Sequence, residues 1–331
     1  MGDIFKTAIS EMKSADFEKL ASTKDTMNIP NLEAEFVNNE PIVRNINELK
    51  PDPKQKIYNM PDKGWKNLPL EDLPSGGLFY PKGAQLTIRS AETKEIRHFS
   101  TIDERDFLNV DDKLNSIVES CSRLTIPGKP SAGYKDLLEF DRLFIILAIR
   151  ELTFIKGESN LTMSIECSNC GNIDRIEISK DKISKLNIDE RLLKYHQPHT
   201  NTFNIQTKTG EEIHLHLPTL GVTSYVKNYT RIRSYQNQFI DETFLRLALY
   251  TIPDYKSLND KTFKEYNVET NQWTRDKISI IPALINLIDN AIIPSVAHQC
   301  TSCGVEGEHP ISFHEGIKGL FLLTDVFEHL V

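Results

Sequence analysis

The chain has 331 residues, a formal net charge of −8 and a pI of about 5.7, with 39% hydrophobic and 26% charged residues. This is the composition of a globular protein with a real core, and it disfavours nucleic-acid binding, which usually needs a basic face. No apolar stretch approaches the ~18 residues of a membrane span, and the first 21 residues lack the apolar segment of a signal peptide. We therefore expect a soluble, intracellular protein of one large or two modest domains.

The first 70 residues differ from the rest of the chain. Apolar residues recur at helical spacing between Asp3 and Ser22, which predicts an amphipathic helix. The stretch Thr23–Lys66 is rich in Asn, Pro, Asp and Lys and favours an extended arm over a packed domain. The apolar stripe of the helix could dock on a partner subunit or fold back on its own chain, and the sequence does not separate the two.

A compact region is predicted to begin near Leu68. Hydrophobic periodicity predicts a strand followed by two amphipathic helices, at Gln85–Arg89, Asp111–Leu124 and Asp136–Glu151. The second helix is apolar over a broad face, so we expect it at the centre of the core. Cys121 lies on the apolar face of the first helix and is interpreted as a small buried hydrophobe.

The second half of the chain is predicted to contain short hairpins and a helical stretch. The two hairpins pair Asn160–Cys167 with Asp174–Ile178 and Phe203–Thr207 with Glu211–Leu217. Residues Val222–Ile293 show mainly helical periodicity, and a further strand should end at Phe313. A helix over Ile317–Val331, with an apolar stripe suited to docking, closes the chain.

Four of the five cysteines form two Cys-x-x-Cys-Gly hooks, Cys167–Gly171 and Cys300–Gly304. An odd cysteine count without a secretory signal disfavours a disulfide framework. The two-residue spacing lets both thiolates face one ion, and the glycine permits a positive φ, so that backbone amides approach the sulfurs. Two hooks supply a closed tetrahedral site for one structural Zn²⁺, with the ligands Cys167, Cys170, Cys300 and Cys303.

Alternatives to this zinc site remain open. Cys170 and Cys300 lie about 130 residues apart, so an inserted region has to bring the two hooks together before they can share an ion. The four cysteines could instead be buried without a metal, or form a redox dithiol, which more often lies at a helix N-terminus. Three histidines near the second hook could replace a cysteine, although exposed or supporting positions are commoner: His298, His309 and His314.

Catalytic signatures are lacking. The sequence has no nucleophile elbow, phosphate-binding loop, dinucleotide fingerprint or zinc-protease motif, and we expect no enzyme. His214 and His216 alternate in a predicted strand, which would place both rings on one face, where they could bind a metal or form a polar stripe. An acidic group is interpreted as a solvated loop and a helix N-terminus: Asp103, Glu104, Asp106, Asp111 and Asp112. The candidates for a basic face are Lys227, Arg231 and Arg233.

The predicted fold class is α+β, a mixed helical body with small β-hairpins and a zinc-ribbon-like four-cysteine module that a helical insertion interrupts. An extended N-terminal arm precedes it. The domain prediction assigns a helix and arm, an α+β region, the zinc-ribbon-like module, a hairpin with the helical insertion, and a C-terminal amphipathic helix. The helix and arm are residues 1–70, and the α+β region is 71–160. The zinc-ribbon-like module combines 161–185 with 298–315. The hairpin with the helical insertion is 186–297, and the C-terminal helix is 316–331.

The segment Leu73–Gly83 reads Leu-Pro-Ser-Gly-Gly-Leu-Phe-Tyr-Pro-Lys-Gly. With the pieces that follow it, in the same order and spacing, it resembles the baseplate hub proteins of T-even-type bacteriophages over about residues 70–220. Those pieces are a short strand, an acidic segment, a helix ending at a cysteine, an Asp-Arg helix, an Arg-x-Leu-Thr element and the first hook. They correspond to Leu86–Arg89, Thr101–Asp106, Ile117–Cys121, Asp141–Arg142, Arg150–Thr153 and Cys167–Cys170.

This resemblance implies a structural or assembly protein of a contractile-tail baseplate, in the virion or in the host cytoplasm during assembly. Its partners would be other baseplate and tail proteins, in an assembly that could be symmetric and multi-copy, with no membrane and with nucleic acid disfavoured. An extended arm and two amphipathic ends suit such protein contacts. The alternative is a zinc-ribbon adaptor or regulator that contacts nucleic acid.

Overall fold

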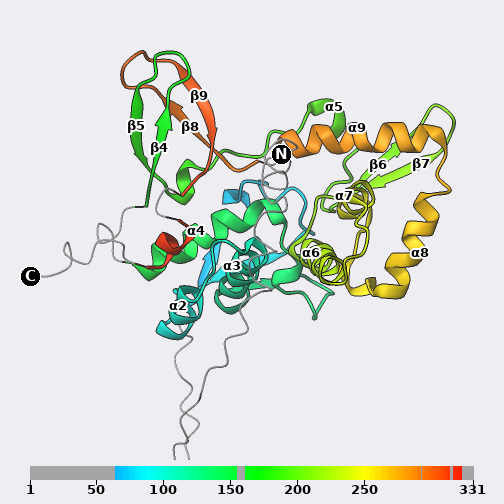
Figure 1. The fold of residues 1–331 in the computed structure, drawn as a ribbon, viewed down its shortest axis with the longest axis horizontal. Coiled ribbons are helices and arrows are strands. Elements are labelled where there is room, and N and C mark those ends of the chain that lie inside the picture. The colour runs from blue at the N-terminus through cyan, green and yellow to red at the C-terminus, as the bar shows by residue number, and fades with distance from the viewer. Residues whose placement is uncertain (1–63, 155–160, 292, 314–315, 323–331) are drawn as a thin grey trace, which may run out of the picture. The chain divides into compact units, whose positions relative to one another are not determined.

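The structure, a computed structural model, describes residues 64–154, 161–291, 293–313 and 316–322. All of them belong to one compact unit, Asn59–Val331. The predicted N-terminal helix and nearly all of the arm lie outside the described residues. Within them, small antiparallel sheets and helices form an α+β fold, as predicted (Figure 1).

A three-stranded antiparallel sheet starts the described chain. It consists of β1 (Lys66–Leu68), β2 (Gln85–Ile88) and β3 (Ser122–Thr125), in that order. Strand β1 lies inside the segment that the sequence assigns to the arm. Leu86 at the centre pairs with Leu68 on one side and Leu124 on the other. All three leucines are buried, so one face of the sheet belongs to the core, as the alternation of strand residues dictates.

Three helices pack with this sheet: α2 (Thr93–Ser100), α3 (Phe107–Cys121) and α4 (Arg142–Thr153). Helix α3 begins earlier than predicted, because the Asp106 carboxylate caps it by accepting the N–H groups of Leu108 and Asn109. It also ends at Cys121 instead of Leu124, because the next four residues pair with β2. Helix α4 is central, as predicted, since every residue from Phe144 to Arg150 is buried.

Asp141, just before α4, joins two of the motifs on which the phage resemblance rests. Its side chain is fully buried. One oxygen accepts the Ser75 N–H at 2.9 Å, and the other accepts the Ser75 hydroxyl at 2.7 Å and the Tyr80 hydroxyl at 2.8 Å. The Tyr80 oxygen in turn accepts the Leu138 N–H at 3.1 Å. Burial raises the pKa of Asp141 to about 6, although these donors oppose the shift.

The described residues between the two hooks contain a hairpin and four longer helices, where the sequence predicts a hairpin and a mainly helical stretch, and one short helix before the hairpin that it does not predict. They are α5 (Glu190–Leu193), β6 (Phe203–Gln206), β7 (Glu212–Leu215), α6 (Leu220–Tyr235), α7 (Glu242–Thr251), α8 (Asp260–Thr270) and α9 (Arg275–Ala291). Helices α6, α7 and α8 enclose a small second core around Phe263, whose ring packs edge-on against Tyr229 and Phe244. None of the described helices has the length and apolar character needed to cross a membrane.

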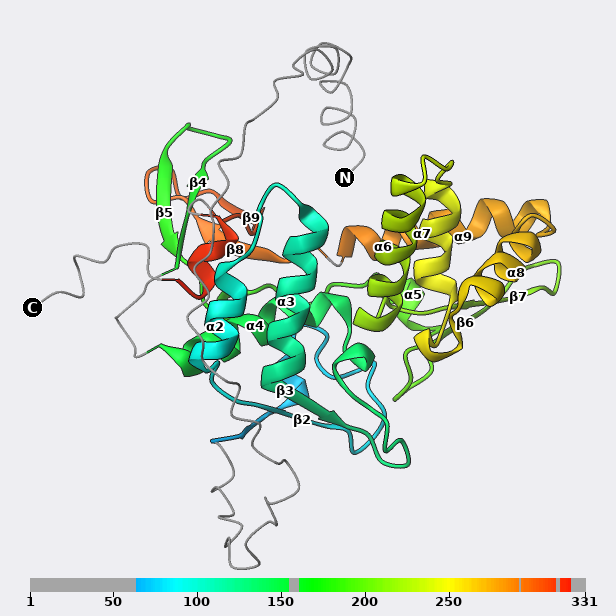
Figure 2. The same ribbon diagram turned by 60° about the horizontal axis from the view of Figure 1, so that its bottom comes forward.

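Two further hairpins lie side by side, apart from this helical region (Figures 1 and 2). Strands β4 (Thr162–Glu166) and β5 (Ile173–Glu177) form the first, and β8 (Ser295–Gln299) and β9 (Glu306–Pro310) form the second. Strand β9 ends at Pro310, three residues before the predicted end. The Ile311 N–H still donates to the Pro294 carbonyl at 3.1 Å, but Pro294 has no N–H with which to return a ladder bond.

The segment after the second hairpin docks on its own chain. Residues Ile317–Leu320 form a 3-10 turn, and the buried Phe321 ring packs edge-on against Phe99 of α2 at 5.2 Å. Glu104, which we expected in a solvated loop, accepts the N–H of Lys318 at 2.9 Å. The described start of the predicted C-terminal docking helix is therefore a single turn packed in cis, and residues 323–331 lie outside the described residues.

Candidate metal centre

The structure brings all four predicted cysteines to one point, at the tips of the two adjacent hairpins. The four sulfur atoms lie within 4.8 Å of one another, the one cluster of at least three metal-ligating groups in the described part of the chain. Two sulfur–sulfur contacts run between the hooks, at 3.6 Å from Cys167 to Cys303 and 3.6 Å from Cys170 to Cys300. The helical insertion therefore begins and ends at the same place, so that the two hooks meet as a shared site requires.

The two hooks have the same backbone geometry. In the first, the Gly171 N–H donates to the Cys167 carbonyl at 2.8 Å, and the Cys167 N–H donates to the Asn172 carbonyl at 2.8 Å. The second hook repeats both bonds at 2.9 Å, with Gly304, Cys300 and Val305 in the same positions. The two glycines have φ values of 71° and 73°, a conformation that side-chain-bearing residues rarely adopt. The sequence therefore fixes both turns locally.

The sulfur spacing fits a single tetrahedral ion. Metal–thiolate bonds of about 2.3 Å at tetrahedral angles separate their sulfurs by about 3.8 Å, close to the 3.6 Å contacts seen here. A disulfide would need about 2.05 Å, and all the cysteines are free. Cys170 and Cys303 are exposed and Cys167 and Cys300 are buried, so not all four cysteines are core residues. The four cysteines could hold a metal ion with every ligand position filled.

The thiols differ in acidity because their neighbours differ. The Val305 N–H, followed by the Asn169 side chain, lowers the pKa of Cys303 to about 6. At Cys170 the Asn172 N–H also lowers the pKa, but the three neighbouring thiols together raise it to about 12. A bound cation would be needed to hold all four as thiolates at once.

A carboxylate that sequence reasoning missed lies beside the sulfurs. Asp174 of β5 accepts bonds from His298 Nε2 at 2.8 Å and from the Thr301 N–H at 3.0 Å, both in the second hairpin. Its pKa is lowered, first by the Thr301 hydroxyl and N–H and then by His298. His298 is thus a supporting residue, one of the two alternatives that the sequence left. His309 belongs to β9, its ring 6.4 Å from that of His298, and His314 lies outside the described residues.

His214 is exposed and His216 is buried, so the two do not form the solvent-facing polar stripe that was one interpretation of their spacing. Strand β7 ends at Leu215, and the His216 N–H turns to donate to the Tyr250 carbonyl at 2.7 Å. The His216 ring is buried with Nδ1 2.6 Å from the Asn201 carbonyl oxygen, and burial lowers its pKa. The exposed His214 ring has its Nδ1 2.8 Å from the Asn204 side-chain oxygen, and neither histidine belongs to a cluster of three or more metal-ligating groups in the described residues.

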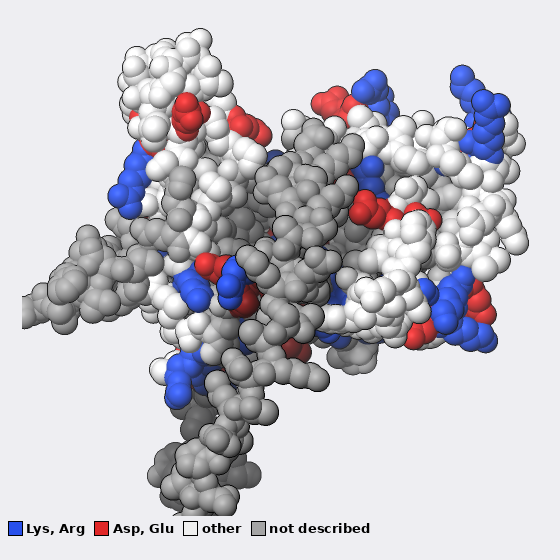
Figure 3. Space-filling model, viewed as in Figure 1, with Lys and Arg blue, Asp and Glu red and all other residues white. Residues whose placement is uncertain are grey.

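The candidate basic face is largely neutralised by acidic partners. Asp111, which we expected at a helix N-terminus, lies inside α3 and is buried, and it pairs with Arg142 at 2.5 Å and Lys227 at 2.6 Å. Arg231 pairs with Asp112 at 3.4 Å. On the face shown in Figure 3, basic and acidic side chains lie in small scattered groups, some of them mixed and some of one sign. This arrangement disfavours binding to a phosphate backbone.

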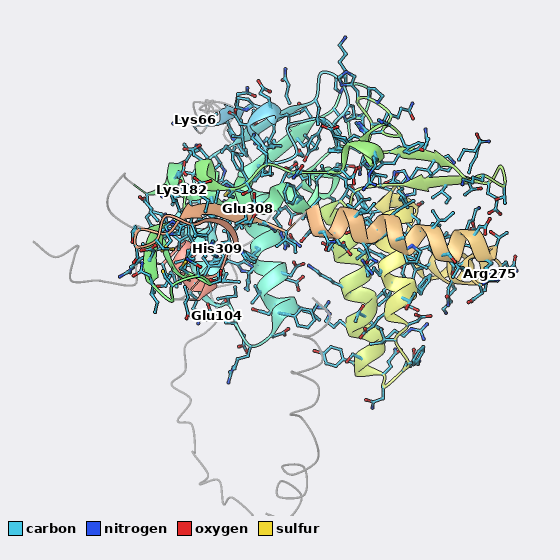
Figure 4. All side chains as sticks on the ribbon, turned by 90° about the horizontal axis from the view of Figure 1, so that it is seen from above. Lys66, Glu104, Lys182, Arg275, Glu308 and His309 are labelled. Atoms are coloured by element: carbon cyan, nitrogen blue, oxygen red, sulfur yellow. The ribbon has the colours of Figure 1, made fainter. Side chains whose placement is uncertain are left out.

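The remaining cysteine and the far end of the insertion stand apart from the metal centre. Cys121 is buried, and burial raises its pKa to about 11, as expected of an inert core thiol. Seen from above, Glu308 and His309 mark the second hairpin, well away from Arg275 at the start of α9 (Figure 4). No family model, curated protein sequence or solved structure matches the chain. Its function has to be argued from its own residues and contacts.

Proposed function

We propose that the chain is a non-enzymatic structural or assembly protein of a contractile-tail bacteriophage baseplate, stabilised by one Zn²⁺. The phage assignment rests on the ordered motifs between residues 70 and 220. Two of them contact each other in the core, because Ser75 and Tyr80 both donate hydrogen bonds to Asp141. Such a contact is expected if the two motifs belong to one common fold. The role in protein contacts rests on a surface feature of the helical insertion.

Zinc is the ion that the donor set favours. Four thiolates in a tetrahedron select Zn²⁺ or iron, and paired knuckles around a single ion are the usual form of a structural zinc site. With four sulfurs as ligands, no position remains for a reacting water, so the ion would hold structure and not catalyse. Metal analysis of the purified chain should give one zinc per chain.

Two aromatic side chains at the tip of the α6–α7 hairpin carry the protein-contact proposal. Tyr235 is 80% exposed and Phe239 is 86% exposed. Large exposed apolar side chains are common at protein interfaces, where aromatic residues supply much of the binding free energy. The seven residues 234–240 carry no formal charge, so the receiving surface on a neighbouring baseplate protein should be an uncharged apolar pocket.

The tip is held rigid by backbone hydrogen bonds. The Gln238 N–H donates to the Arg233 carbonyl at 2.9 Å, and the Asn237 N–H donates to the Ser234 carbonyl at 3.0 Å. Asn237 has a φ of 50°, the left-handed residue that ends a helix in the Schellman motif. A tip ordered in advance loses little conformational entropy on binding, which suits it to recognition.

Replacing the two aromatic residues should separate binding from folding. With Tyr235→Ser and Phe239→Ser combined, we expect the yield of infectious particles to fall at least tenfold, because interface aromatics each contribute about 2 kcal/mol or more. The melting temperature should stay within about 2 °C, since exposed substitutions change stability little. Val268→Ser, at another exposed apolar residue (58%), is the matched control. Normal yield from the double variant would contradict this role for the tip.

Retention on heparin tests the nucleic-acid alternative. Because Lys227 and Arg231 already pair with Asp111 and Asp112, we expect the chain to elute from heparin below about 0.2 M salt, where proteins with several phosphate contacts are still retained. Strong, salt-sensitive retention would favour the adaptor function over the baseplate role.

A further inference from the structure

The two hairpins of the metal centre are joined at three levels. Among the described strands they belong to separate two-stranded sheets. At the base, Ile183 forms a β-bridge with Val296, and the Ser184 N–H donates to the Ser295 carbonyl at 2.8 Å. At the tips the four sulfurs meet. Between these levels lies a set of side chains that we name the Asp174 network: Asn172, Asp174, His298 and Thr301.

The carboxylate of Asp174 connects the two hairpins between the base and the tips. Both oxygens of Asp174 face the second hairpin: one accepts from His298 Nε2 at 2.8 Å and the Thr301 N–H at 3.0 Å, and the other accepts the Thr301 hydroxyl. Asn172 of its own hairpin donates to Asp174 at 2.8 Å and lies 3.9 Å from the Cys300 sulfur. Asp174 is only 8% exposed, so these donors replace water around a carboxylate that would otherwise be costly to bury.

The network is not a by-product of having two similar hooks. Thr301 follows the first cysteine of its hook and donates its N–H to Asp174, and Ser168 holds the equivalent place in the other hook. Asp174 lies four residues after the second cysteine of its hook, and Gly307 holds that place in the second hairpin. The acceptor therefore lies on the first hairpin and the donors lie on the second. The two hairpins therefore contribute different groups to the Asp174 network, and none of its hydrogen bonds involves a metal ion.

We infer that Asp174 is a positioning residue that docks hairpin β8–β9 on hairpin β4–β5 before a metal ion binds. The two cysteine pairs are then aligned in the metal-free protein, despite the long insertion between them. In small zinc domains that are unfolded without metal, binding free energy has to order the chain. Here the base and the Asp174 network supply part of that order. The inference rests on the metal centre of the proposed function and is independent of the baseplate role.

Cobalt binding to the metal-free full-length chain tests the inference, because Co²⁺ bound to thiolates absorbs visibly. We expect Asp174→Asn to weaken Co²⁺ affinity about 10–100-fold, as loss of a supporting residue typically does, and Thr301→Val to weaken it less. Ser168→Ala, at the equivalent position of the other hook, should leave affinity unchanged. The absorption spectrum should keep its shape in every variant, because the four sulfurs remain the ligands.

Hydrogen exchange provides a measurement that does not depend on the metal. The Thr301 amide should exchange at least tenfold more slowly in the metal-free wild type than in metal-free Asp174→Asn. Equal exchange rates, equal Co²⁺ affinities, or a spectrum that loses a thiolate signature in Asp174→Asn would each overturn the inference. Failure of the wild type to bind Co²⁺ at all would instead overturn the metal centre itself, and with it the zinc part of the proposed function.

Discussion

Cys170→Ser and Cys303→Ser should each remove the metal ion and lower the melting temperature by about 10 °C, which for a unit of this size corresponds to roughly 4 kcal/mol. Both side chains are exposed, so exchanging sulfur for oxygen removes almost no packing. Any large loss of stability must then come from the ion, whose binding free energy contributes to folding. Calorimetry and metal analysis of the same samples would test both parts.

Cys121→Ser is the informative control for these variants. This cysteine is fully buried but remote from the metal centre, so its replacement should cost packing and burial of a hydroxyl, about 1–3 kcal/mol, and leave the metal content at the wild-type level. If Cys170→Ser keeps both its metal and its melting temperature while Cys121→Ser loses stability, the four-cysteine site is wrong.

Asp141→Ala should destabilise the protein by about 4 kcal/mol. The substitution leaves the Ser75 N–H, the Ser75 hydroxyl and the Tyr80 hydroxyl without their acceptor in a site closed to water, and each unsatisfied buried donor costs about 1–3 kcal/mol. Chemical denaturation would measure the loss. Asp181→Ala, at an acid whose side chain is 76% exposed, should change stability by less than about 0.5 kcal/mol. A similar small effect at Asp141 would show that water reaches the site.

The ionisation of Asp141 also gives a pH signature. Burial raises its pKa to about 6 in the folded state, so the folded chain holds this proton while the unfolded chain releases it near pH 4. The contribution of Asp141 to the free energy of unfolding is therefore fully present below pH 4, and it falls by about 3 kcal/mol as the pH rises through 6. Asp141→Asn cannot ionise at this position. The difference in free energy of unfolding between wild type and Asp141→Asn should therefore shrink by about 3 kcal/mol between pH 4 and 7. A deficit that is constant with pH would contradict the raised pKa.

The features that the sequence predicted correctly depend on neighbours along the chain. The hooks, with their glycines at positive φ, are local turns, and the broad apolar face of α4 can be counted from the spacing of its residues. For that reason the four cysteines, the central helix and the α+β class all follow from pattern alone.

The features that it missed depend on contacts between distant segments. Asp174 has no local signal, because its donors His298 and Thr301 lie more than 120 residues away. Helix α3 ends at Cys121 because Ser122–Thr125 finds a partner in β2, which periodicity within the segment cannot reveal. Helix α2 was missed because it has eight residues, of which only Ile96 and Phe99 are apolar, and so short a segment does not show a repeating period.

The separation of the two hooks along the chain has a consequence for synthesis. The first cysteine pair leaves the ribosome about 133 residues before Cys303, which at roughly 5–20 residues per second is a delay of roughly 7–27 s. During that interval Cys167 and Cys170 are two ligands without their counterparts, while the helical insertion between the hooks is still being made. The insertion can fold around its own core at Phe263 in this time. The four-cysteine site would then form only after the helices between the two hooks have folded.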